Sequence, residues 1–127
     1  MVVDIEDLDT DEDMVVYQGL PFNGTMQASY PGGARWREFP YLDGFEHGLC
    51  REWYSSGQLK REWHAVWGVA QGKVCEWHKN GQIKSVAIYL KGAELEYDEW
   101  SDAGLLVTHR ELDQQSELWK YANGSNP

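Results

Sequence analysis

Two parts of the stretch Gly48–Tyr89 align with one another, and this self-similarity determines the expected architecture. The first part reads Gly48-Leu-Cys-Arg-Glu-Trp-Tyr-Ser-Ser-Gly57-Gln-Leu-Lys-Arg-Glu-Trp63. The second part reads Gly72-Lys-Val-Cys-Glu-Trp-His-Lys-Asn-Gly81-Gln-Ile-Lys-Ser-Val-Ala87. The period is 24 residues. Self-similarity at periods of about 20–50 residues is typical of repeat architectures, so the chain is expected to stack similar units side by side.

Glycines repeat with the same spacing along more of the chain. The series are Gly24, Gly48 and Gly72; Gly33, Gly57 and Gly81; and Gly44, Gly68 and Gly92. A fourth copy covers about residues 93–112, with Gly104 one residue short of the period. Gly at the last position of a three-residue hairpin loop supplies the left-handed conformation that this loop needs. Each copy is therefore interpreted as strand, tight turn and strand, with turns at Gly33, Gly57, Gly81 and Gly104.

The expected fold class is all-β: an elongated single-layer antiparallel meander of about four hairpin repeats and about eight strands, followed by a short C-terminal helix. A meander is favoured because the connections are short and rich in Gly, whereas parallel pairing needs a crossover of about a dozen residues or more. The pairing of Trp53 with Leu59 and of Glu52 with Lys60 gives favourable cross-strand contacts. The same register in the next copy gives the pairs Trp77–Ile83 and Glu76–Lys84.

This register assigns the strand residues to two faces, because side chains alternate along a strand. One face is expected to hold Leu49, Trp53, Leu59, Trp63, Cys75, Trp77, Ile83 and Ala87. The other is expected to hold Glu52, Tyr54, Lys60, Glu62, Val74, Glu76, His78 and Val86. Cys50 and Cys75 then lie on opposite sides of the sheet, so a disulfide between them is not expected.

The chain divides into three segments by composition. Residues 1–14 form an acidic arm, expected to be flexible because a run of like charges repels itself. Residues 15–112 form the repeat domain. Residues 113–127 are expected to form a capping helix and tail, with Asp113 at the start of the helix and Asn123-Gly124 at its end.

The net charge is −10, and seven of the 21 acids lie in the arm. These acids are Asp4, Glu6, Asp7, Asp9, Asp11, Glu12 and Asp13. Phosphate contacts need clustered Lys and Arg, so nucleic acid is not an expected partner. Binding to a membrane surface also needs a basic face, so no membrane partner is expected. The sequence contains neither a long apolar run nor an apolar leader, which favours a cytoplasmic location.

No residue pattern predicts catalysis, a metal site or a cofactor. The four His residues show no His-x-His spacing, and the two Cys residues do not form a Cys-x-x-Cys pair. The recurrent Glu52, Glu62 and Glu76 lie beside lysines and are better explained by cross-strand ion pairs than by a catalytic dyad. The chain is therefore not expected to be an enzyme.

The two central copies resemble MORN repeats (membrane occupation and recognition nexus), in the variant form typical of bacteria. The residues that carry the resemblance are Gly48-x4-Trp53-Tyr54-x2-Gly57-Gln58-Leu59-Lys60 and Gly72-x4-Trp77-His78-x-Asn80-Gly81-Gln82-Ile83-Lys84. The first copy departs from the pattern with Ser29 in place of Trp, and the fourth with Leu95 or Glu96 in place of the leading Gly. The resemblance implies one hairpin per repeat and an aromatic-lined groove. It also implies an antitoxin or immunity protein, which is how bacterial proteins of this type are commonly labelled.

Three classes of function are compatible with these features: a protein-binding antitoxin, a non-catalytic scaffold or membrane-associated MORN module, and an enzyme. We favour an antitoxin or immunity protein that binds a cognate, basic, nuclease-type toxin, and we expect it to be a monomer. Acids would steer the encounter and aromatic anchors would hold the complex. The Trp residues could instead be buried as core, and both interpretations can hold for different Trp residues. The expected partner-binding residues are the seven arm acids together with Trp53, Tyr54, Trp77, His78 and Trp100.

Overall fold

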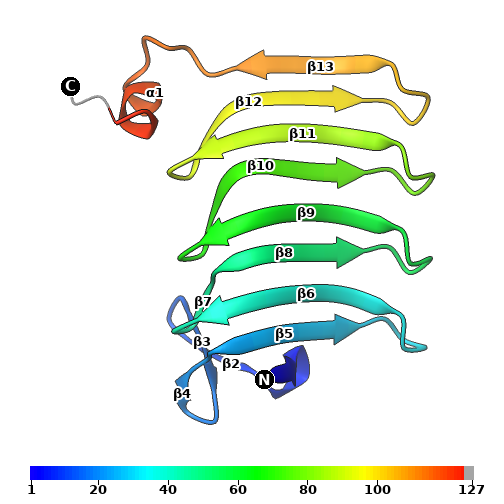
Figure 1. Ribbon diagram of the computed structural model, residues 1–127, viewed down its shortest axis with the longest axis vertical. Coiled ribbons are helices and arrows are strands. Elements are labelled where there is room, and N and C mark those ends of the chain that lie inside the picture. Colours follow the sequence, from blue (N-terminus) through cyan, green and yellow to red (C-terminus); the bar gives the residue numbers. More distant parts are fainter. Residues whose placement is uncertain (125–127) are drawn as a thin grey trace.

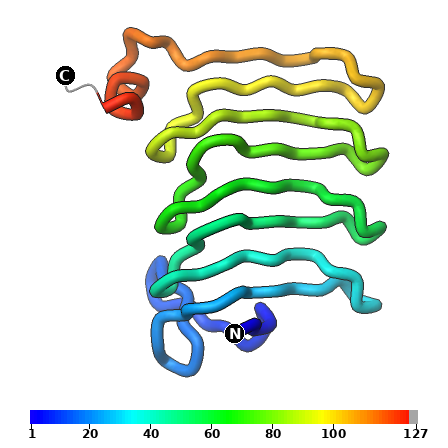
Figure 2. The backbone as a smooth tube through the Cα atoms, viewed as in Figure 1, coloured from blue at the N-terminus to red at the C-terminus, as the bar shows by residue number. Residues whose placement is uncertain are grey.

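The computed structural model describes residues 1–124 and consists mostly of β-strands. Eight long antiparallel strands follow one another along the long axis of the molecule (Figure 1). They are β5 (Gly24–Ser29), β6 (Arg35–Leu42), β8 (Gly48–Trp53), β9 (Leu59–Val66), β10 (Val69–Trp77), β11 (Ile83–Leu90), β12 (Ala93–Trp100) and β13 (Leu106–Glu111). A two-residue strand, β7 (Phe45–Glu46), pairs with β6 beside β8. The predicted all-β meander is confirmed, and the backbone trace in Figure 2 shows the regular repetition of its hairpins.

The hairpin turns at one end of the strands have the predicted chemistry. Gly33, Gly57, Gly81 and Gly104 all have positive φ, between 87° and 98°. The Gly57 N–H donates to the carbonyl of Tyr54, and the Tyr54 N–H donates to the carbonyl of Gln58, both at 2.9 Å. This pattern is a three-residue loop with its Gly in the left-handed region.

The turns at the opposite end are tighter and are held by side chains. Trp67 and Gly68 both have positive φ, as type I′ turns require, and the pairs Asp43–Gly44 and Lys91–Gly92 repeat this conformation. The Trp67 N–H donates to His47 Nδ1 at 3.2 Å. Asn23 and Gln71, one period on either side of His47, accept the corresponding N–H groups of Asp43 and Lys91. The left-handed residue of each turn is thus fixed by a side chain 20 residues earlier in the chain.

The predicted register is confirmed at Trp53–Leu59 and Trp77–Ile83 but is wrong one position further along. Glu52 lies opposite Arg61 rather than Lys60, and in the next copy Glu76 lies opposite Ser85 rather than Lys84. The physical reason is a β-bulge, in which one strand carries an extra residue opposite a single residue of its neighbour. Lys60 and Lys84 are these extra residues.

The bulges also correct the predicted faces, since one extra residue reverses every side chain beyond it. The pairing places Trp63 and Val74 on the face of Cys50 and Glu52, opposite to the face of Trp53. We call these the core face and the Trp face of the sheet. The core face contributes Met26, Ala28, Phe39, Cys50, Trp63, Ala65, Val74 and Ala87 to the buried cluster. Ala87 and Trp63 therefore leave the face on which they were predicted, and Glu62 and Val86 change place with them.

Trp63 is the largest side chain of the core face in the central repeats. It is 8% exposed and packs edge-on against Phe39, with ring centroids 5.1 Å apart. The guanidinium of Arg61 lies 4.5 Å from the centre of its ring. Stacked side chains of neighbouring strands therefore bury this face even though the meander is a single layer.

The two cysteines are free and lie on opposite faces, as predicted. Cys50 is fully buried on the core face, and burial raises the pKa of its thiol to about 12. Cys75 is half-buried on the Trp face, and burial raises the pKa of its thiol as well. Both thiols therefore stay protonated near neutral pH.

The N-terminal arm is ordered, which corrects the expectation of a flexible segment. β1 (Val2–Asp4) pairs in parallel with β5, and a 3₁₀ turn, η1 (Ile5–Asp7), follows it. The small sheet of β2 (Asp9–Asp11), β3 (Met14–Tyr17) and β4 (Leu20–Pro21) lies at the same end of the molecule. The reason is apolar burial: Val3 is 6% exposed, and Ile5 and Leu8 pack against the core cluster.

The C-terminal helix is confirmed but starts later than predicted. Helix α1 spans Glu117–Ala122, and its N-cap is Ser116, whose hydroxyl accepts the Trp119 N–H at 3.0 Å. Asp113 instead accepts the N–H of Gln115 in the preceding turn. Asn123 ends the helix as expected. The last three residues of the predicted tail, 125–127, lie outside the described part of the chain.

Candidate functional site

The Trp face carries a continuous row of large apolar side chains. Trp53 lies opposite Leu59, Trp77 opposite Ile83, and Trp100 opposite Leu106. We call this row the Trp stripe (Trp53, Leu59, Trp77, Ile83, Trp100, Leu106). Five of its members are half-buried, and Leu106 is 59% exposed. The stripe crosses the six strands from β8 to β13, a length of about 24 Å at about 4.8 Å between strands.

The two interpretations of the Trp residues, buried core and accessible surface, therefore apply to different residues. Trp63 is core, whereas Trp53, Trp77 and Trp100 lie partly accessible on the other face. Bulky aromatic side chains that are only half-buried provide anchors for a protein partner, since their remaining apolar area can still be desolvated.

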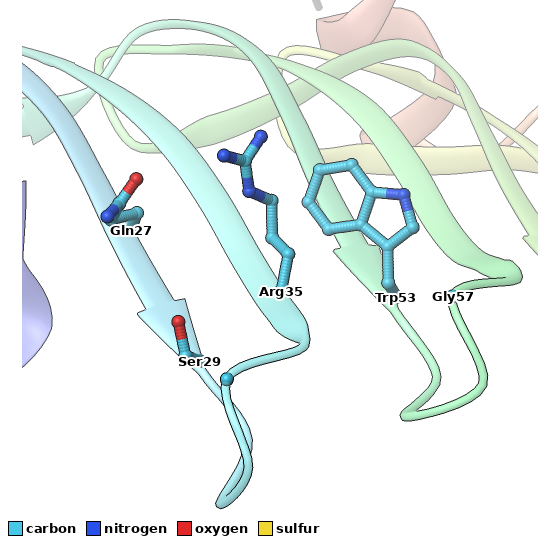
Figure 3. Close-up of a pocket in the computed structure, with 6 residues that line it drawn as sticks. Gln27, Ser29, Arg35, Trp53 and Gly57 are labelled. Atoms are coloured by element: carbon cyan, nitrogen blue, oxygen red, sulfur yellow. The ribbon is translucent and has the colours of Figure 1, made fainter.

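A hollow of about 520 Å³ lies at the β8 end of the stripe. Its lining includes Gln27, Ser29, Arg35 and Trp53, and Figure 3 shows the Gln27, Arg35 and Trp53 side chains on the same side of the sheet. The Arg35 guanidinium lies 5.8 Å from the centre of the Trp53 ring and bonds Glu38 at 2.6 Å. The hollow thus combines an aromatic wall, one cation and neutral polar groups, which suits a polar side chain of a partner.

Tyr54 and His78, both predicted as partner-binding residues, connect neighbouring repeats. The Tyr54 hydroxyl donates to the carbonyl oxygen of Trp77 at 2.7 Å. His78 Nε2 lies 2.8 Å from the carbonyl oxygen of Trp100, and the Tyr30 hydroxyl lies 2.6 Å from that of Trp53. These side chains hold the strand of each Trp in place. Contact of Tyr54 or His78 with a partner stays a prediction.

The structure divides the seven arm acids into two groups and does not gather them beside the Trp stripe. Asp4 pairs in register with Gln27, and its carboxylate accepts the Glu6 N–H at the start of η1. Asp9 lies in β2, and Asp11, Glu12 and Asp13 line a hollow with Phe45, at the opposite end of the strands from the stripe. Only the group of Asp4, Glu6 and Asp7 therefore comes near the β5 side of the hollow.

Outside the arm, the 14 acids and 11 bases of the chain are unevenly distributed. Residues 14–92 carry nine bases and six acids, whereas residues 93–124 carry eight acids and two bases. The long axis in Figure 1 therefore has an acidic N-terminal end, a slightly basic centre and an acidic C-terminal end. This second acidic end is not evident from the sequence, because its acids are spread over 32 residues and do not form a run.

One group of side chains at the second acidic end could hold a cation. Glu96, Asp98 and His109 lie on the Trp face of β12 and β13, and one ligand atom of each lies within 4.8 Å of the others. His109 already bonds Asp98 through Nδ1 and Glu111 through Nε2, at 2.5 and 3.1 Å. The hydrogen bond to Asp98 raises the pKa of His109, so a proton competes with any metal for this group. The predicted absence of a metal site overlooked this cluster, because its residues meet only through the β12–β13 register.

Comparison with protein families identifies the two central hairpins. Residues 46–65 and 70–91 match the MORN repeat variant. The matched stretches are the hairpin of β7, β8 and β9 and the hairpin of β10 and β11. No curated protein and no solved structure matches the chain. The MORN repeat match supports a protein-binding or scaffold module.

The flanking hairpins continue the architecture of the two matched ones. The hairpins β5–β6 and β12–β13 lie outside the two matched stretches, yet they continue the same sheet and place their turn glycines at positive φ.

The helix α1 is not long or apolar enough to cross a membrane, and the same holds for every helix in residues 1–124.

Proposed function

We propose that this protein is an antitoxin or immunity protein that neutralises a basic, nuclease-type toxin by direct binding, without catalysis of its own. The observation that carries the proposal is the Trp stripe, a half-exposed apolar surface that crosses six strands and extends into the acidic C-terminal end. A toxin that binds nucleic acid has a positively charged cleft, because phosphate contacts need Lys and Arg. An acidic protein with aromatic anchors is complementary to such a cleft.

The division of roles follows from the separation of charge and apolar area. Exposed acids raise the association rate by electrostatic steering, by up to about 1000-fold at low salt. Desolvated aromatic side chains determine how long the complex lasts, because most of the affinity of an interface is expressed in the dissociation rate. The acids of both ends would raise the association rate. Trp53, Trp77 and Trp100 would lower the dissociation rate.

The experiment uses the product of the neighbouring reading frame as the toxin. Both proteins are purified, and association and dissociation rates are measured at low and high salt. Removal of residues 1–13 is unsuitable, because it would delete buried Val3 together with the acids. Neutralisation of exposed acids, with Glu6→Gln, Asp7→Asn and Asp9→Asn together, changes charge and keeps the core.

The expected result is slower association in the neutralised variant, with the difference lost at high salt. Trp77→Ala should increase the dissociation rate, whereas Trp119→Ala, which changes a half-buried Trp outside the stripe, should not. Absence of a complex with the neighbouring product would contradict the antitoxin role. Binding of the protein to anionic lipid vesicles would instead favour the membrane-associated module.

A further inference from the structure

The last strand of the sheet has a free edge. The strand order ends at β13, and Figure 1 shows no strand beyond it among the residues that the structure describes. Helix α1 contacts β12, and its Tyr121 carbonyl accepts a hydrogen bond from Nζ of Lys91, in the turn between β11 and β12. At the opposite end of the sheet, β1 already covers β5. The edge of β13 is therefore the open end of the meander.

The backbone of this edge is oriented to accept another strand. The Leu112 N–H donates to the Leu95 carbonyl at 2.9 Å, so this position bonds inward to β12. Hydrogen-bonded and non-bonded positions alternate along an antiparallel pair. The N–H and C=O groups of Glu111 and His109 therefore point away from β12. Edges with such free groups are templates for strand addition.

Apolar side chains are exposed at the same edge. Leu105, Leu106 and Val107 are 69%, 59% and 56% exposed. Leu106 is also the last member of the Trp stripe, opposite Trp100. A strand added to β13 would extend the stripe by one more strand and cover these three side chains.

The charge around the edge selects the occupant. The eight acids of residues 93–124 include Glu96 and Glu111 on the Trp face and Glu94 and Glu99 on the core face. A second copy of the protein would bring an equal set of acids to the edge, which disfavours self-pairing. On the core face the Arg110 guanidinium already pairs with Glu94. An incoming strand with Lys or Arg on the Trp face and aliphatic residues beside the exposed residues 105–107 would therefore match the charge and the apolar area.

We propose that β13 binds an extended basic segment of a protein partner, which adds to the sheet as a further strand. Main-chain hydrogen bonds to His109 and Glu111 would supply affinity, and the acids would supply selectivity. The proposal rests on the proposed function for the source of the segment. Its test uses the free protein and synthetic peptides, so that strand addition and toxin neutralisation can fail separately.

The first measurement is amide hydrogen exchange by NMR on the unaltered protein. One probe is a capped seven-residue peptide in which Lys alternates with Val and Thr, and the control peptide has Glu in place of Lys. Saturation at about ten times the dissociation constant should slow exchange at His109 and Glu111 about tenfold. The Glu peptide should leave both rates unchanged. Equal effects of the two peptides, or protection only at residues outside β13, overturn the proposal.

The second measurement compares two substitutions at one position. His109→Pro removes an outward N–H, and Pro is tolerated at such edge positions. His109→Val keeps the N–H and removes the imidazole. We expect His109→Pro to weaken binding of the Lys peptide about tenfold. His109→Val should bind the peptide as tightly as the unaltered protein, or more tightly. Equal affinities of the two variants overturn the proposal.

Two further results deal with a variant that fails to fold and with self-association of the protein. If His109→Pro fails to fold, the exchange measurement on the unaltered protein still tests strand addition. If sedimentation shows a dimer of the free protein, and His109 and Glu111 are protected without any peptide, the occupant is a second copy and the proposal is overturned.

Discussion

The Tyr54 hydroxyl bonds the carbonyl oxygen of Trp77, 23 residues further along the chain and in the next hairpin. The same relationship links Tyr30 with Trp53 and His78 with Trp100. One side chain per repeat thus fixes the strand end that carries the next Trp. These bonds connect the stability of each hairpin to the position of the apolar stripe on its neighbour.

Tyr54→Phe is expected to destabilise the protein, because it removes this hydrogen bond and keeps the ring. The free energy of unfolding should fall by about 0.5–1.5 kcal/mol, the usual net contribution of one hydrogen bond. Urea denaturation measures the change. Tyr121→Phe, at a side chain that is 60% exposed, is the matched control and should have little effect. Similar losses in both variants would show that the bond to Trp77 contributes nothing.

Trp63→Ala and Trp77→Ala test the assignment of the two residues to different faces. Trp63 is 8% exposed and packs against Phe39, so its removal leaves a cavity and should cost about 3–5 kcal/mol. Trp77 is only half-buried, so less apolar area changes its exposure to water. Trp77→Ala should therefore lower the free energy of unfolding by about 1–2 kcal/mol. Denaturant midpoints of the two variants give the comparison. Equal losses would mean that the Trp stripe is core.

The hairpins were predictable because the features that specify them are local. Gly57 and Gly81 mark their turns, and the aromatic–aliphatic match of Trp53 with Leu59 sets the register next to the turn. The bulge at Lys60 was not predictable, because an extra residue in a strand needs no special residue type. Its consequence was large, since it moved Trp63 to the opposite face.

The ordered N-terminal arm was missed for a different reason. The run of acids indicated a solvated segment, yet Val3, Ile5 and Leu8 are interleaved with the acids and pack into the core. The spacing of these three apolar residues among the acids was the available signal of a buried face. The second acidic end and the free edge of β13 follow from the strand order, which places the last hairpin far from the arm.

Gly57→Val is expected to destabilise the first central turn. Gly57 has φ of 94°, where a β-branched residue is strained, and a Cβ atom there would meet no other atom within 4 Å. The loss therefore reports backbone strain alone and should be about 1–3 kcal/mol. Gly57→Asn, which tolerates positive φ better, should lose less. Thermal unfolding of the two variants measures this order, and the reverse order would exclude a left-handed turn residue.

His109 is expected to make the stability of the last hairpin depend on pH. Its hydrogen bond with Asp98, and a further one with Glu111, raise its pKa above the ordinary value of 6.5. A raised pKa in the folded state means that protonation favours folding. The stabilisation is therefore complete below the unfolded pKa and is lost as the pH rises through the folded pKa.

The direct measurement is an NMR titration of the His109 ring, which should show a midpoint above 6.5 that falls in Asp98→Asn. The melting temperature should also fall as the pH rises above about 6.5, and it should fall more in the unaltered protein than in His109→Gln, which cannot titrate at this position. Because His109 is exposed, the difference should be small and should shrink with salt. Identical slopes in the two proteins would mean that His109 exchanges its carboxylate partners for water without cost to the fold.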